Sequence, residues 1–343
     1  MITHYLKNLS RSTLPILNGF LSYYLGLKFQ KGPLFVNWDI TGKCNARCIF
    51  CDRWKTTKNE LSTKEKLEII KKLGKSGVWF LSLCGGEPLL TKDLELILKE
   101  IKKHGMLLNI STNGLLLREK MKLLIKYTDF ITVSIQSADP KIHDFMLGQK
   151  NSFERTLKGI KVLKVKRKNK KPKVYGRVVL NSKSLMELRE ILNFWRKYVD
   201  EIFLQPICEN KKMLFKAPFN LKILSKHKKY FKDFYQLLRE FKCDNMYNQL
   251  VPLYIFKKHR LREEIRCFST FFFLTLDEKG NVYSCSARRK RLGNLLEKSL
   301  TEILNSERTK KFRRKLKKNK KRCFCWHSGS MLNVYLSKFF FNL

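Results

Sequence analysis

Apolar and polar positions alternate between two periods from about residue 33 onward. Short apolar runs bounded by turn residues are typical of buried parallel strands. We expect such strands at residues 34–40, 78–84, 106–112, 129–135, 174–180 and 201–206. Amphipathic helical patterns lie between them, near residues 63–74, 91–104, 116–127, 152–166 and 184–198. Six strand–helix units without an internal hairpin predict an α/β fold, a right-handed parallel sheet wound into a partial (β/α)6 TIM-like barrel.

The segments on either side of this alternation follow other patterns. Residues 14–29 form an amphipathic stretch with few basic residues on its polar side before Lys28, so we expect it to pack on the barrel rather than lie on a membrane surface. Residues 211–266 are rich in lysine and carry helical patterns without strand signals, and we expect them to cover the barrel mouth.

The last part of the chain predicts a small α+β domain. Residues 271–276 and 281–285 alternate around a turn that contains Gly280, which indicates a β-hairpin. A basic amphipathic helix is expected at about 298–318, and the apolar tail 331–343 is expected to dock back onto the domain. These patterns divide the chain into an N-terminal helical segment, a barrel, a helical connection and a C-terminal domain at residues 1–31, 32–210, 211–266 and 267–343.

The composition of the chain indicates which partners it attracts and in which cellular compartment it lies. The formal net charge of +43 attracts nucleic acid, an anionic membrane or an acidic peptide, and the alternative is a lysine-rich composition without a partner. No run of some eighteen uncharged apolar residues exists, so we expect no transmembrane helix. Ten cysteines without a secretory signal indicate a reducing, cytoplasmic location and metal sites rather than disulfides.

Three of the cysteines lie in one short loop directly after the first predicted strand. Cys44, Cys48 and Cys51 are spaced C-x3-C-x2-C, with Phe50 before the last. A structural zinc site usually takes four protein ligands, whereas three thiolates on one loop suit a [4Fe–4S] cluster with one iron left free of protein. The next cysteine, Cys84, lies inside a predicted strand and is expected to be a core thiol.

This loop, led by an apolar strand and a Thr, resembles the cluster motif of the radical S-adenosylmethionine (SAM) superfamily. The resemblance implies that Cys44, Cys48 and Cys51 hold a [4Fe–4S] cluster whose free iron binds SAM. It also implies that reduction, by a partner such as ferredoxin or flavodoxin, cleaves SAM to methionine and a 5′-deoxyadenosyl radical. Phe50 would screen the cluster from water, beside the SAM adenine.

A glycine-rich turn follows the second predicted strand. Gly85 and Gly86 let the backbone come close to a ligand, and the carboxylate of Glu87 can accept hydrogen bonds from an ammonium group. The turn matches the family's GGE motif, and the resemblance therefore implies that Glu87 binds the SAM amino group.

Polar residues also end the third and fourth predicted strands, where barrel enzymes carry their chemistry. Asn113 ends the third and is expected to bind the cofactor, and Ser134, with Arg155 on the next helix, would suit the SAM carboxylate. The alternatives are that Asn113 only caps a turn and that Arg155 only pairs with a surface acid. Gln136 stands where many members of the family have an acidic residue, and His143 is expected to stabilise a turn rather than to catalyse.

A second set of cysteines lies in the C-terminal domain. Cys267 and Cys285 flank the predicted hairpin and resemble the opening of a SPASM or twitch domain, and Cys323 and Cys325 follow. Four thiolates would saturate a second, auxiliary [4Fe–4S] cluster used for electron transfer, and a structural zinc ion is the alternative. Cys208 and Cys243 are expected to be buried thiols, although Cys243 is a possible spare ligand.

The resemblance predicts a radical enzyme for oxidative modification or maturation of a peptide or protein. The positive charge favours an acidic substrate. A second hypothesis is a radical enzyme that acts on a small molecule, a nucleotide or RNA. A third, non-enzymatic one is a zinc-stapled nucleic-acid-binding protein.

Overall fold

The computed structural model describes residues 9–28, 31–55, 60–207, 218–257, 265–286, 290–318, 332–333 and 336–337. Contacts between Cα atoms group the chain into two units. The first consists of Met1–Gly42, Thr57–Asn109 and Arg262–Leu343, and the second of Lys43–Thr56 and Ile110–Leu261. Strand β3 (Leu107–Thr112) spans the boundary between them.

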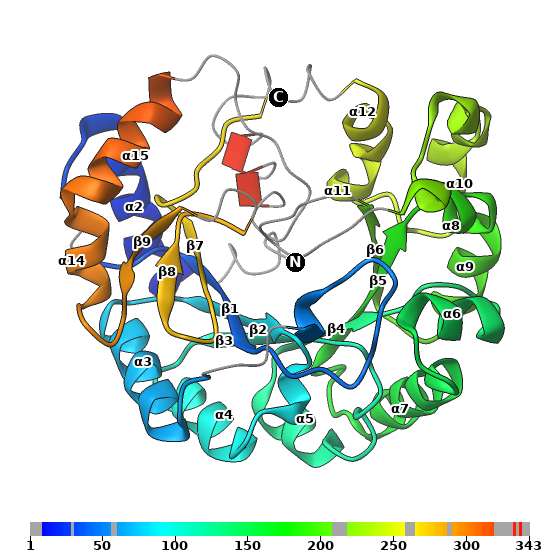
Figure 1. The fold of residues 1–343 in the computed structure, drawn as a ribbon, viewed down its shortest axis with the longest axis horizontal. Coiled ribbons are helices and arrows are strands. Elements are labelled where there is room, and N and C mark those ends of the chain that lie inside the picture. The colour runs from blue at the N-terminus through cyan, green and yellow to red at the C-terminus, as the bar shows by residue number, and fades with distance from the viewer. Residues whose placement is uncertain are drawn as a thin grey trace. The chain divides into compact units, whose positions relative to one another are not determined.

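The first unit holds the first half of the parallel sheet. Strand β1 (Phe35–Thr41) pairs in parallel with β2 (Phe80–Gly85) on one side and with β7 (Phe273–Leu276) on the other. The strand order in this unit is β3-β2-β1-β7-β8-β9. Helices α3 (Thr63–Lys75) and α4 (Leu94–Lys103) each bury one apolar stripe, and in Figure 1 they lie on one face of these strands. Helix α3 begins with a capping box between Ser62 and Glu65, which explains its sharp start.

The second unit continues the parallel alternation in the order β6-β5-β4-β3. Its strands are β4 (Phe130–Ser134), β5 (Lys173–Leu180) and β6 (Glu201–Pro206), and both neighbouring pairs, β4–β5 and β5–β6, are parallel. Its helices are α5 (Met121–Tyr127), α6 (Pro140–Leu147), α7 (Ser152–Lys166), α8 (Ser182–Met186), α9 (Leu188–Trp195), α10 (Phe234–Glu240), α11 (Met246–Gln249) and α12 (Val251–Phe256). The six predicted strands and the open α/β architecture are thus confirmed.

Two helical expectations for this unit need correction. Residues 140–147 form helix α6, where the sequence indicated only a turn. The helix expected at 184–198 is two helices, α8 and α9, which meet at Glu187. The backbone of Glu187 leaves the helical region, with φ −101° and ψ 18°, and its carboxylate accepts a hydrogen bond from Ser137 Oγ at 2.9 Å.

The predicted C-terminal hairpin is confirmed and extends the sheet. Strand β7 pairs antiparallel with β8 (Asn281–Tyr283), which pairs antiparallel with β9 (Arg291–Asn294). Asp277 holds the turn by accepting hydrogen bonds from the backbone N–H groups of Lys279 and Asn281, and Gly280 has φ +75°. The parallel pairing of β7 with β1 was not expected from the sequence.

Helix α2 (Leu9–Leu25) packs against aromatic residues that precede β7. The ring of Phe20 lies 4.9 Å from that of Phe272, and the ring of Tyr23 lies about 5 Å from those of Phe268 and Phe271. A Cβ on Gly19 would come within 2.7 Å of the Phe272 ring, so only glycine allows this close approach. Packing, rather than membrane contact, is therefore the role of this face of α2.

The basic helix and the apolar tail predicted for the end of the chain are also present in part. The helix expected at 298–318 is α14 (Leu300–Asn305) and α15 (Glu307–Lys318), with a break at Ser306, whose side chain accepts a hydrogen bond from Thr309 N. Tail residues Leu332 and Leu336 are buried, and Asn333 and Ser337 accept hydrogen bonds from the backbone of Phe268 and Arg266. Docking of the tail is confirmed for these four residues.

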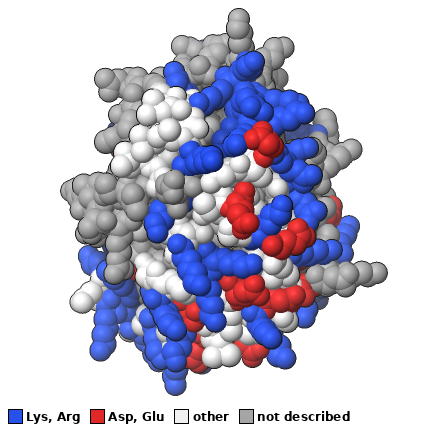
Figure 2. Space-filling view, turned by 90° about the vertical axis from the view of Figure 1, so that its left-hand side faces the viewer, with Lys and Arg blue, Asp and Glu red and all other residues white. Residues whose placement is uncertain are grey.

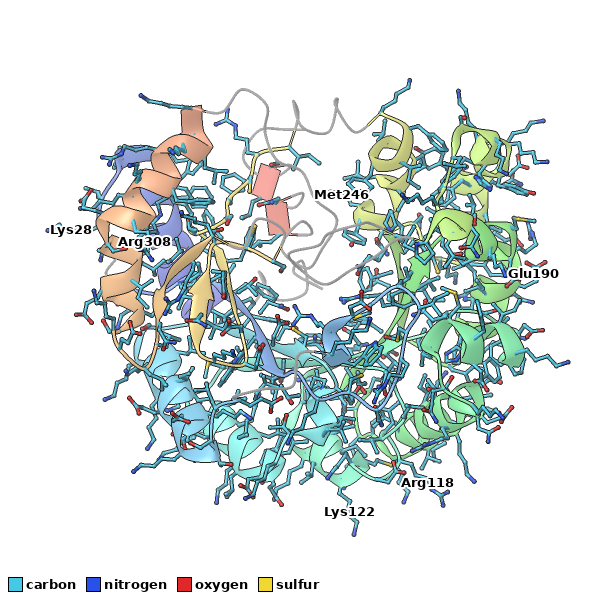
Figure 3. All side chains as sticks on the ribbon, in the orientation of Figure 1. Lys28, Arg118, Lys122, Glu190, Met246 and Arg308 are labelled. Atoms are coloured by element: carbon cyan, nitrogen blue, oxygen red, sulfur yellow. The ribbon has the colours of Figure 1, made fainter. Side chains whose placement is uncertain are left out.

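Charged side chains project from the helices, as Figure 3 shows for Lys122 of α5, Glu190 of α9 and Arg308 of α15. Within the ranges given above, no helix is both long and apolar enough to span a bilayer. Residues 218–257 contain helices and no strand, in agreement with the sequence. The division into four segments and the covering of the barrel mouth stay predictions.

One ion pair in the second unit gives a stability test. Asp200 accepts two hydrogen bonds from Arg167, at 2.5 and 2.8 Å, and one from Val174 N at 2.7 Å. Burial raises the pKa of Asp200, but these hydrogen bonds and the charges of Arg167 and Lys173 outweigh it and lower the pKa overall. Its stabilisation is therefore complete above the unfolded pKa of about 4 and is lost as pH falls through the lower folded value.

We expect Asp200→Asn to lower the free energy of unfolding at pH 7 by about 1–3 kcal/mol. The loss follows from the weaker hydrogen bonds of a neutral amide. In thermal unfolding, the melting temperature of the variant should lie below that of the wild type by a constant amount from pH 8 to pH 5. This difference should narrow only below about pH 4. Asp233→Asn is the matched control, because Asp233 is exposed and its side chain makes no capping hydrogen bond. Equal melting temperatures for the two variants would contradict this assignment.

Candidate functional site

The cysteine loop that follows β1 is docked on the last turn of α6 in the second unit. Arg47 N donates to Leu147 O at 2.9 Å, and Ile49 N donates to Met146 O at 3.2 Å. Gly148 ends α6 in the left-handed conformation, with φ +61°, and a Cβ there would lie 2.3 Å from the carbonyl oxygen of Arg47. The position of Cys44, Cys48 and Cys51 thus depends on how α6 ends.

Helix α6 is itself fixed at both ends by carboxylates. Asp139 is its N-cap and accepts hydrogen bonds from the backbone N–H groups of Lys141 and Ile142, at 2.7 and 3.0 Å. Asp144, near the other end, accepts hydrogen bonds from Asn151 N and Phe153 N at the start of α7, at 2.6 and 2.8 Å. The D-P-x-x-H-D stretch therefore sets the platform for the cysteine loop.

His143 belongs to the same platform and has a structural role. Its side chain is fully buried against Phe153 and Trp195, and its Nδ1 lies 3.0 Å from Ser152 Oγ. Burial lowers the pKa of His143 to about 4, so the ring is neutral at physiological pH. The sequence-based expectation of a turn-stabilising histidine agrees with this placement.

The three thiols of the loop are partly exposed and form no disulfide. Arg47 donates to the carbonyl oxygens of Cys44 and Ala46, at 2.7 and 3.0 Å, and its guanidinium lies 4.7 Å from the ring centre of Trp54. Trp54 Nε1 donates in turn to Cys51 O at 3.0 Å. Arg47 and Trp54 thus tie the two ends of the loop together. Neither residue could be recognised from the sequence, since no motif distinguishes it from a surface residue.

Asn113, at the end of β3, reaches this loop. Its Nδ2 donates to Asn45 Oδ1 at 2.7 Å and lies 3.9 Å from Cys44 Sγ, within hydrogen-bonding range for sulfur. Its Oδ1 accepts from Leu115 N at 3.0 Å, so the same side chain also caps the turn. The structure thereby brings Asn113 to the first cysteine, and its contact with SAM stays a prediction.

The residues predicted for the SAM carboxylate are placed less directly. Arg155 Nη2 donates to Leu115 O at 3.1 Å and lies 3.8 Å from the carboxylate of Glu119, with 43 % of its side chain exposed. This placement favours the alternative of a surface ion pair in the absence of ligand. Ser134 ends β4 and is half-buried. Gln136 Oε1 accepts from Val179 N at 3.1 Å, so that side chain is used within the sheet. Roles for Ser134 and Arg155 in SAM binding stay predictions.

The Gly85-Gly86-Glu87 turn lies in the first unit, against the end of β1. Gly86 N donates to Thr41 O at 2.7 Å, and a Cβ on Gly85, which has φ +121°, would lie 2.3 Å from the same oxygen. Glu87 is fully buried, and its Oε1 accepts from Leu89 N at 3.1 Å. Only glycine fits at position 85, because both its conformation and its contact exclude a side chain.

A carboxylate outside any recognised motif holds the start of the cysteine loop. Glu60 Oε1 accepts hydrogen bonds from Thr41 Oγ1 at 2.8 Å and from Gly42 N at 2.7 Å. Thr41 lies three residues before Cys44 in the sequence. Glu60 therefore fixes the exit of β1, and the sequence offered no signal for it.

Cys84, the residue before the glycine turn, differs from the expected core thiol. Its sulfur lies 3.0 Å from Asn37 Nδ2 and 3.1 Å from Asp39 Oδ1, and it is only half-buried. These contacts are polar because Asn37, Asp39 and Cys84 project from the same face of two paired strands, at alternate positions.

Of the four cysteines predicted to hold the auxiliary cluster, the structure describes Cys267 and Cys285. Cys267 is half-buried and Cys285 is buried. A hydrogen bond from Ser269 Oγ to Ser284 O joins the two segments that carry them. Cys323, Cys325 and Cys208 lie outside the described residues. Cys243 is the buried thiol expected, and burial raises its pKa to about 11.

These residues fit an iron–sulfur cluster by the chemistry of their donors. Cys44, Cys48 and Cys51 are three partly exposed thiols on one loop, with the amide of Asn113 beside the first. This is the donor set that a [4Fe–4S] cluster with one open iron requires. In the part of the chain that the structure describes, no three His, Cys, Asp or Glu side chains surround a site for a single metal ion.

Gly148→Ala should lower the iron content of the protein after anaerobic reconstitution, because the added methyl group displaces the Arg47 carbonyl and the loop with it. The matched control is Gly26→Ala, since Gly26 also has a positive φ, +70°, but faces open space. Both variants carry the left-handed penalty of about 1–2 kcal/mol. Iron counts and cluster absorbance that are equal in the two variants would refute this role of Gly148.

Two curated proteins match part of the chain. The chain is 33 % identical over 143 residues to the AdoMet-dependent heme synthase of Methanosarcina barkeri, a match that covers 40 % of this chain and 41 % of that protein. It is 34 % identical over 125 residues to a probable GTP 3′,8-cyclase of Thermococcus kodakarensis, over 35 % of this chain and 40 % of that protein. The matches thus span about two fifths of the length of these curated relatives.

Solved structures share the fold over more of the chain. SuiB of Streptococcus suis bound to S-adenosylmethionine matches with a TM-score of 0.62 and 16 % identity, over 82 % of this chain and 68 % of that one. The enzyme anSMEcpe, with bound AdoMet and the Cp18Cys peptide, matches with a TM-score of 0.63 and 16 % identity, over 90 % of this chain and 96 % of that one. At this identity the likeness concerns the fold.

Two family models match in chain order. The model of the Radical SAM superfamily matches residues 38–194, which include the cysteine loop, the Gly85-Gly86-Glu87 turn and Asn113. The model of the SPASM iron–sulfur cluster-binding domain matches residues 267–327, which begin at Cys267 and include Cys285, Cys323 and Cys325. The chain therefore belongs to the radical SAM superfamily and carries a C-terminal SPASM iron–sulfur cluster-binding domain.

Proposed function

We propose that the protein reductively cleaves SAM and uses the radical to modify a peptide or protein oxidatively. The observation that carries this proposal is the docked cysteine loop, in which three partly exposed thiols are held by α6, Arg47 and Trp54. When bound, the cluster and SAM supply the electron and the 5′-deoxyadenosyl radical. Membership of an enzyme family removes the non-enzymatic zinc-protein alternative.

In this proposal, residues of the chain bind the cluster and orient it. Cys44, Cys48 and Cys51 hold the cluster, and the amide of Asn113 donates toward the sulfur of Cys44. A hydrogen bond to a cluster thiolate stabilises its negative charge and raises the reduction potential of a cluster. Phe50, which precedes Cys51 in the sequence and is half-buried, is assigned the shielding of the cluster from water.

The SAM amino group is assigned to the Gly85-Gly86-Glu87 turn. The carboxylate of Glu87 is buried and already oriented by Leu89 N, so little side-chain entropy is lost on binding an ammonium group. The close approach of Gly85 and Gly86 to the β1 backbone keeps this turn in place. Ser134 and Arg155 are the candidates for the SAM carboxylate, and Arg155 would have to exchange Glu119 for it.

The SPASM domain is assigned an auxiliary [4Fe–4S] cluster on Cys267, Cys285, Cys323 and Cys325. Cys267 and Cys285 support this assignment because they lie on two segments that a hydrogen bond from Ser269 to Ser284 joins. Four thiolates leave no iron open, which suits passage of an electron rather than binding of substrate. A structural zinc ion at these four residues is the alternative.

A peptide or protein substrate is supported by the solved neighbours. One structure of SuiB carries the precursor peptide SuiA, with a TM-score of 0.60 and 18 % identity to this chain. The net charge of +43 favours an acidic substrate by electrostatic attraction. The ten cysteines favour a reducing, cytoplasmic compartment, where ferredoxin or flavodoxin would supply the electron.

A small-molecule substrate is the second candidate, and the curated relatives favour it. Besides the heme synthase and the GTP cyclase, a Fe-coproporphyrin III synthase of Methanosarcina barkeri is 31 % identical over 144 residues, covering 40 % of this chain and 36 % of that protein. The protein is incubated either with deuterated candidate peptides or with deuterated iron coproporphyrin. Mass spectrometry of the 5′-deoxyadenosine formed then distinguishes the two substrate classes. Deuterium enters this product only from the true substrate.

The test of the radical reaction is an iron count and a SAM-cleavage assay with dithionite after anaerobic reconstitution. We expect roughly eight irons per chain, which is two clusters, and 5′-deoxyadenosine as product. Cys48→Ala should abolish cleavage, whereas Cys243→Ala, the control at a buried thiol, should preserve it. About four irons with cleavage would reassign the SPASM cysteines to zinc. Full cleavage by Cys48→Ala would overturn the site.

Glu87→Gln should weaken the binding of SAM roughly tenfold or more, because the amide loses the charge that attracts the ammonium group. The Gln oxygen can still accept the hydrogen bond from Leu89 N, so the turn should stay folded. Equilibrium binding of SAM to the reconstituted protein measures the effect, and Glu190→Gln is the exposed control. An affinity for SAM equal in both variants would remove Glu87 from the SAM site.

A further inference from the structure

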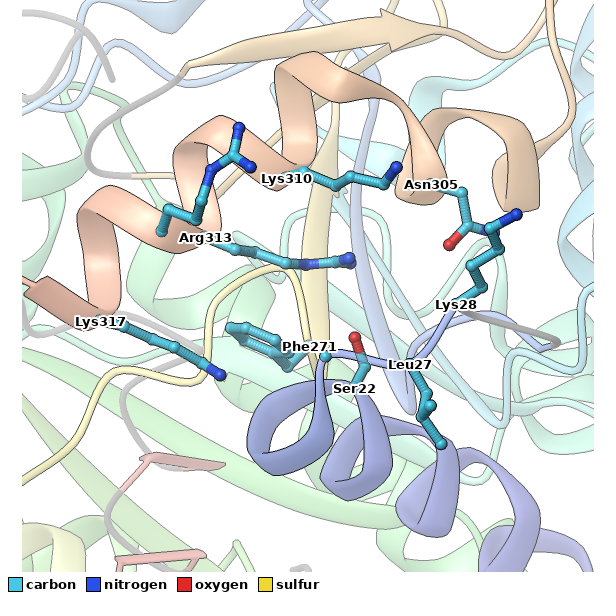
Figure 4. A pocket seen from close by; sticks show the side chains of 10 residues that line it. Ser22, Leu27, Lys28, Phe271, Asn305, Lys310, Arg313 and Lys317 are labelled. Carbon is cyan, nitrogen blue, oxygen red and sulfur yellow. The ribbon is translucent and has the colours of Figure 1, made fainter.

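A cavity of about 240 Å³ lies in the first unit, between helices α2 and α15 and the loop that precedes β7 (Figure 4). Its lining is strongly basic, and none of its ten lining residues is acidic. These residues are Ser22, Gly26, Leu27, Lys28, Phe271, Asn305, Lys310, Arg313, Arg314 and Lys317. The motifs that define the radical site contribute nothing to it.

One face of α15 supplies most of the positive charge. Lys310, Arg313, Arg314 and Lys317 recur at the spacing that aligns side chains along one side of a helix. Eight of the twelve residues of α15 are Lys or Arg. Figure 2 views the molecule from the side on which α2, α14 and α15 lie in Figure 1, and Lys and Arg side chains are spread over the face it shows, with Asp and Glu among them.

Arg313 makes the cavity a built site rather than a surface patch. It is only 8 % exposed, and its guanidinium donates to Thr270 O at 2.7 Å and to Leu304 O at 2.9 Å. It also lies 4.9 Å from the ring centre of Phe271. The carbonyl groups orient this cation in the wall of the cavity but do not neutralise it.

The cations of the cavity also act on one another. Burial lowers the pKa of Arg313 to about 9. The pKa of Lys317 is lowered by burial first and by the positive charge of Arg313 second. Glu307 offsets part of the charge at the other end, since it pairs with Lys310 at 2.7 Å and lies 3.7 Å from Arg314. A bound anion would relieve the remaining repulsion.

We propose that this cavity binds a phosphate group. The guanidinium and ammonium groups of α15, together with Lys28, match an anion with several acceptor oxygens, and Ser22 and Asn305 add neutral donors. The volume of the cavity is below the roughly 300–1,000 Å³ of sites for drug-sized ligands, so it accommodates a head group rather than a whole cofactor. This site is independent of the radical chemistry.

The phosphate comes either from a free phosphate compound or from a lipid head group. Leu27 lines the cavity and is 50 % exposed, and the neighbouring Leu25 is 67 % exposed. Exposed leucines beside a basic cavity would enter the apolar layer of a membrane whose phosphates the cavity holds. The two sources share one chemistry and differ in whether these leucines contribute.

The test is isothermal titration of the full-length protein with inorganic phosphate. We expect binding that is weakened roughly tenfold or more by Lys310→Gln with Arg314→Gln, which removes two charge-assisted hydrogen bonds. The matched control is Lys311→Gln with Lys315→Gln, which changes the same helix and the same net charge but lies outside the cavity. Arg313 is left intact because its hydrogen bonds also support the fold.

Cosedimentation with vesicles identifies the source of the phosphate. Binding to equimolar phosphatidylglycerol and phosphatidylcholine that is lost in the cavity variant, and in Leu25→Ser with Leu27→Ser, supports the lipid form of the proposal. Phosphate binding without vesicle binding supports the free form. No phosphate binding by the wild type, or equal losses in the cavity variant and its control, would overturn the proposal. Affinity for an RNA oligonucleotide that falls equally in both would then assign the charge to nonspecific polyanion binding.

Discussion

The docking of the cysteine loop on the last turn of α6 is the constraint on which the radical site depends. Two backbone hydrogen bonds and a glycine in the left-handed conformation set the distance between the loop and the helix. Both elements, the loop and α6, belong to the same unit of the chain. The position of α6 depends in turn on Asp139 and Asp144, because these carboxylates fix the two ends of the helix.

The regular part of the fold could be predicted from the sequence because its signals are local. Strands β1 to β6 follow apolar runs, and the hairpin of β7 and β8 follows the turn at Gly280. The breaks at Glu187 and Ser306 could not be predicted, since each depends on one side chain that bonds to its surroundings. The pairing of β7 with β1 was equally inaccessible, because no local pattern specifies a neighbour so distant in the chain.

Some residues of the candidate site could likewise be predicted from the sequence, and others could not. The three cysteines and the Gly85-Gly86-Glu87 turn are visible as motifs, because cofactor chemistry restricts both residue type and spacing. Arg47, Trp54 and Glu60 are not, since they act through backbone carbonyl and N–H groups that leave no trace in the sequence. Cys84 was misjudged because alternation along a strand reveals which face a side chain takes, but not whether that face is polar.

The central place of β1 between β2 and β7 has a consequence for the order in which the protein is made. Trp38 of β1 donates a hydrogen bond to the carbonyl oxygen of Asp277, a residue 239 positions later. During synthesis, β1 can pair with β2 early, but its other edge stays open until most of the chain has left the ribosome. An open strand edge of this kind is a template for wrong pairing. The C-terminal hairpin therefore acts as the closing strand of an already assembled sheet, and a chain stopped before it would leave the strand that leads into the cysteine loop exposed on one side.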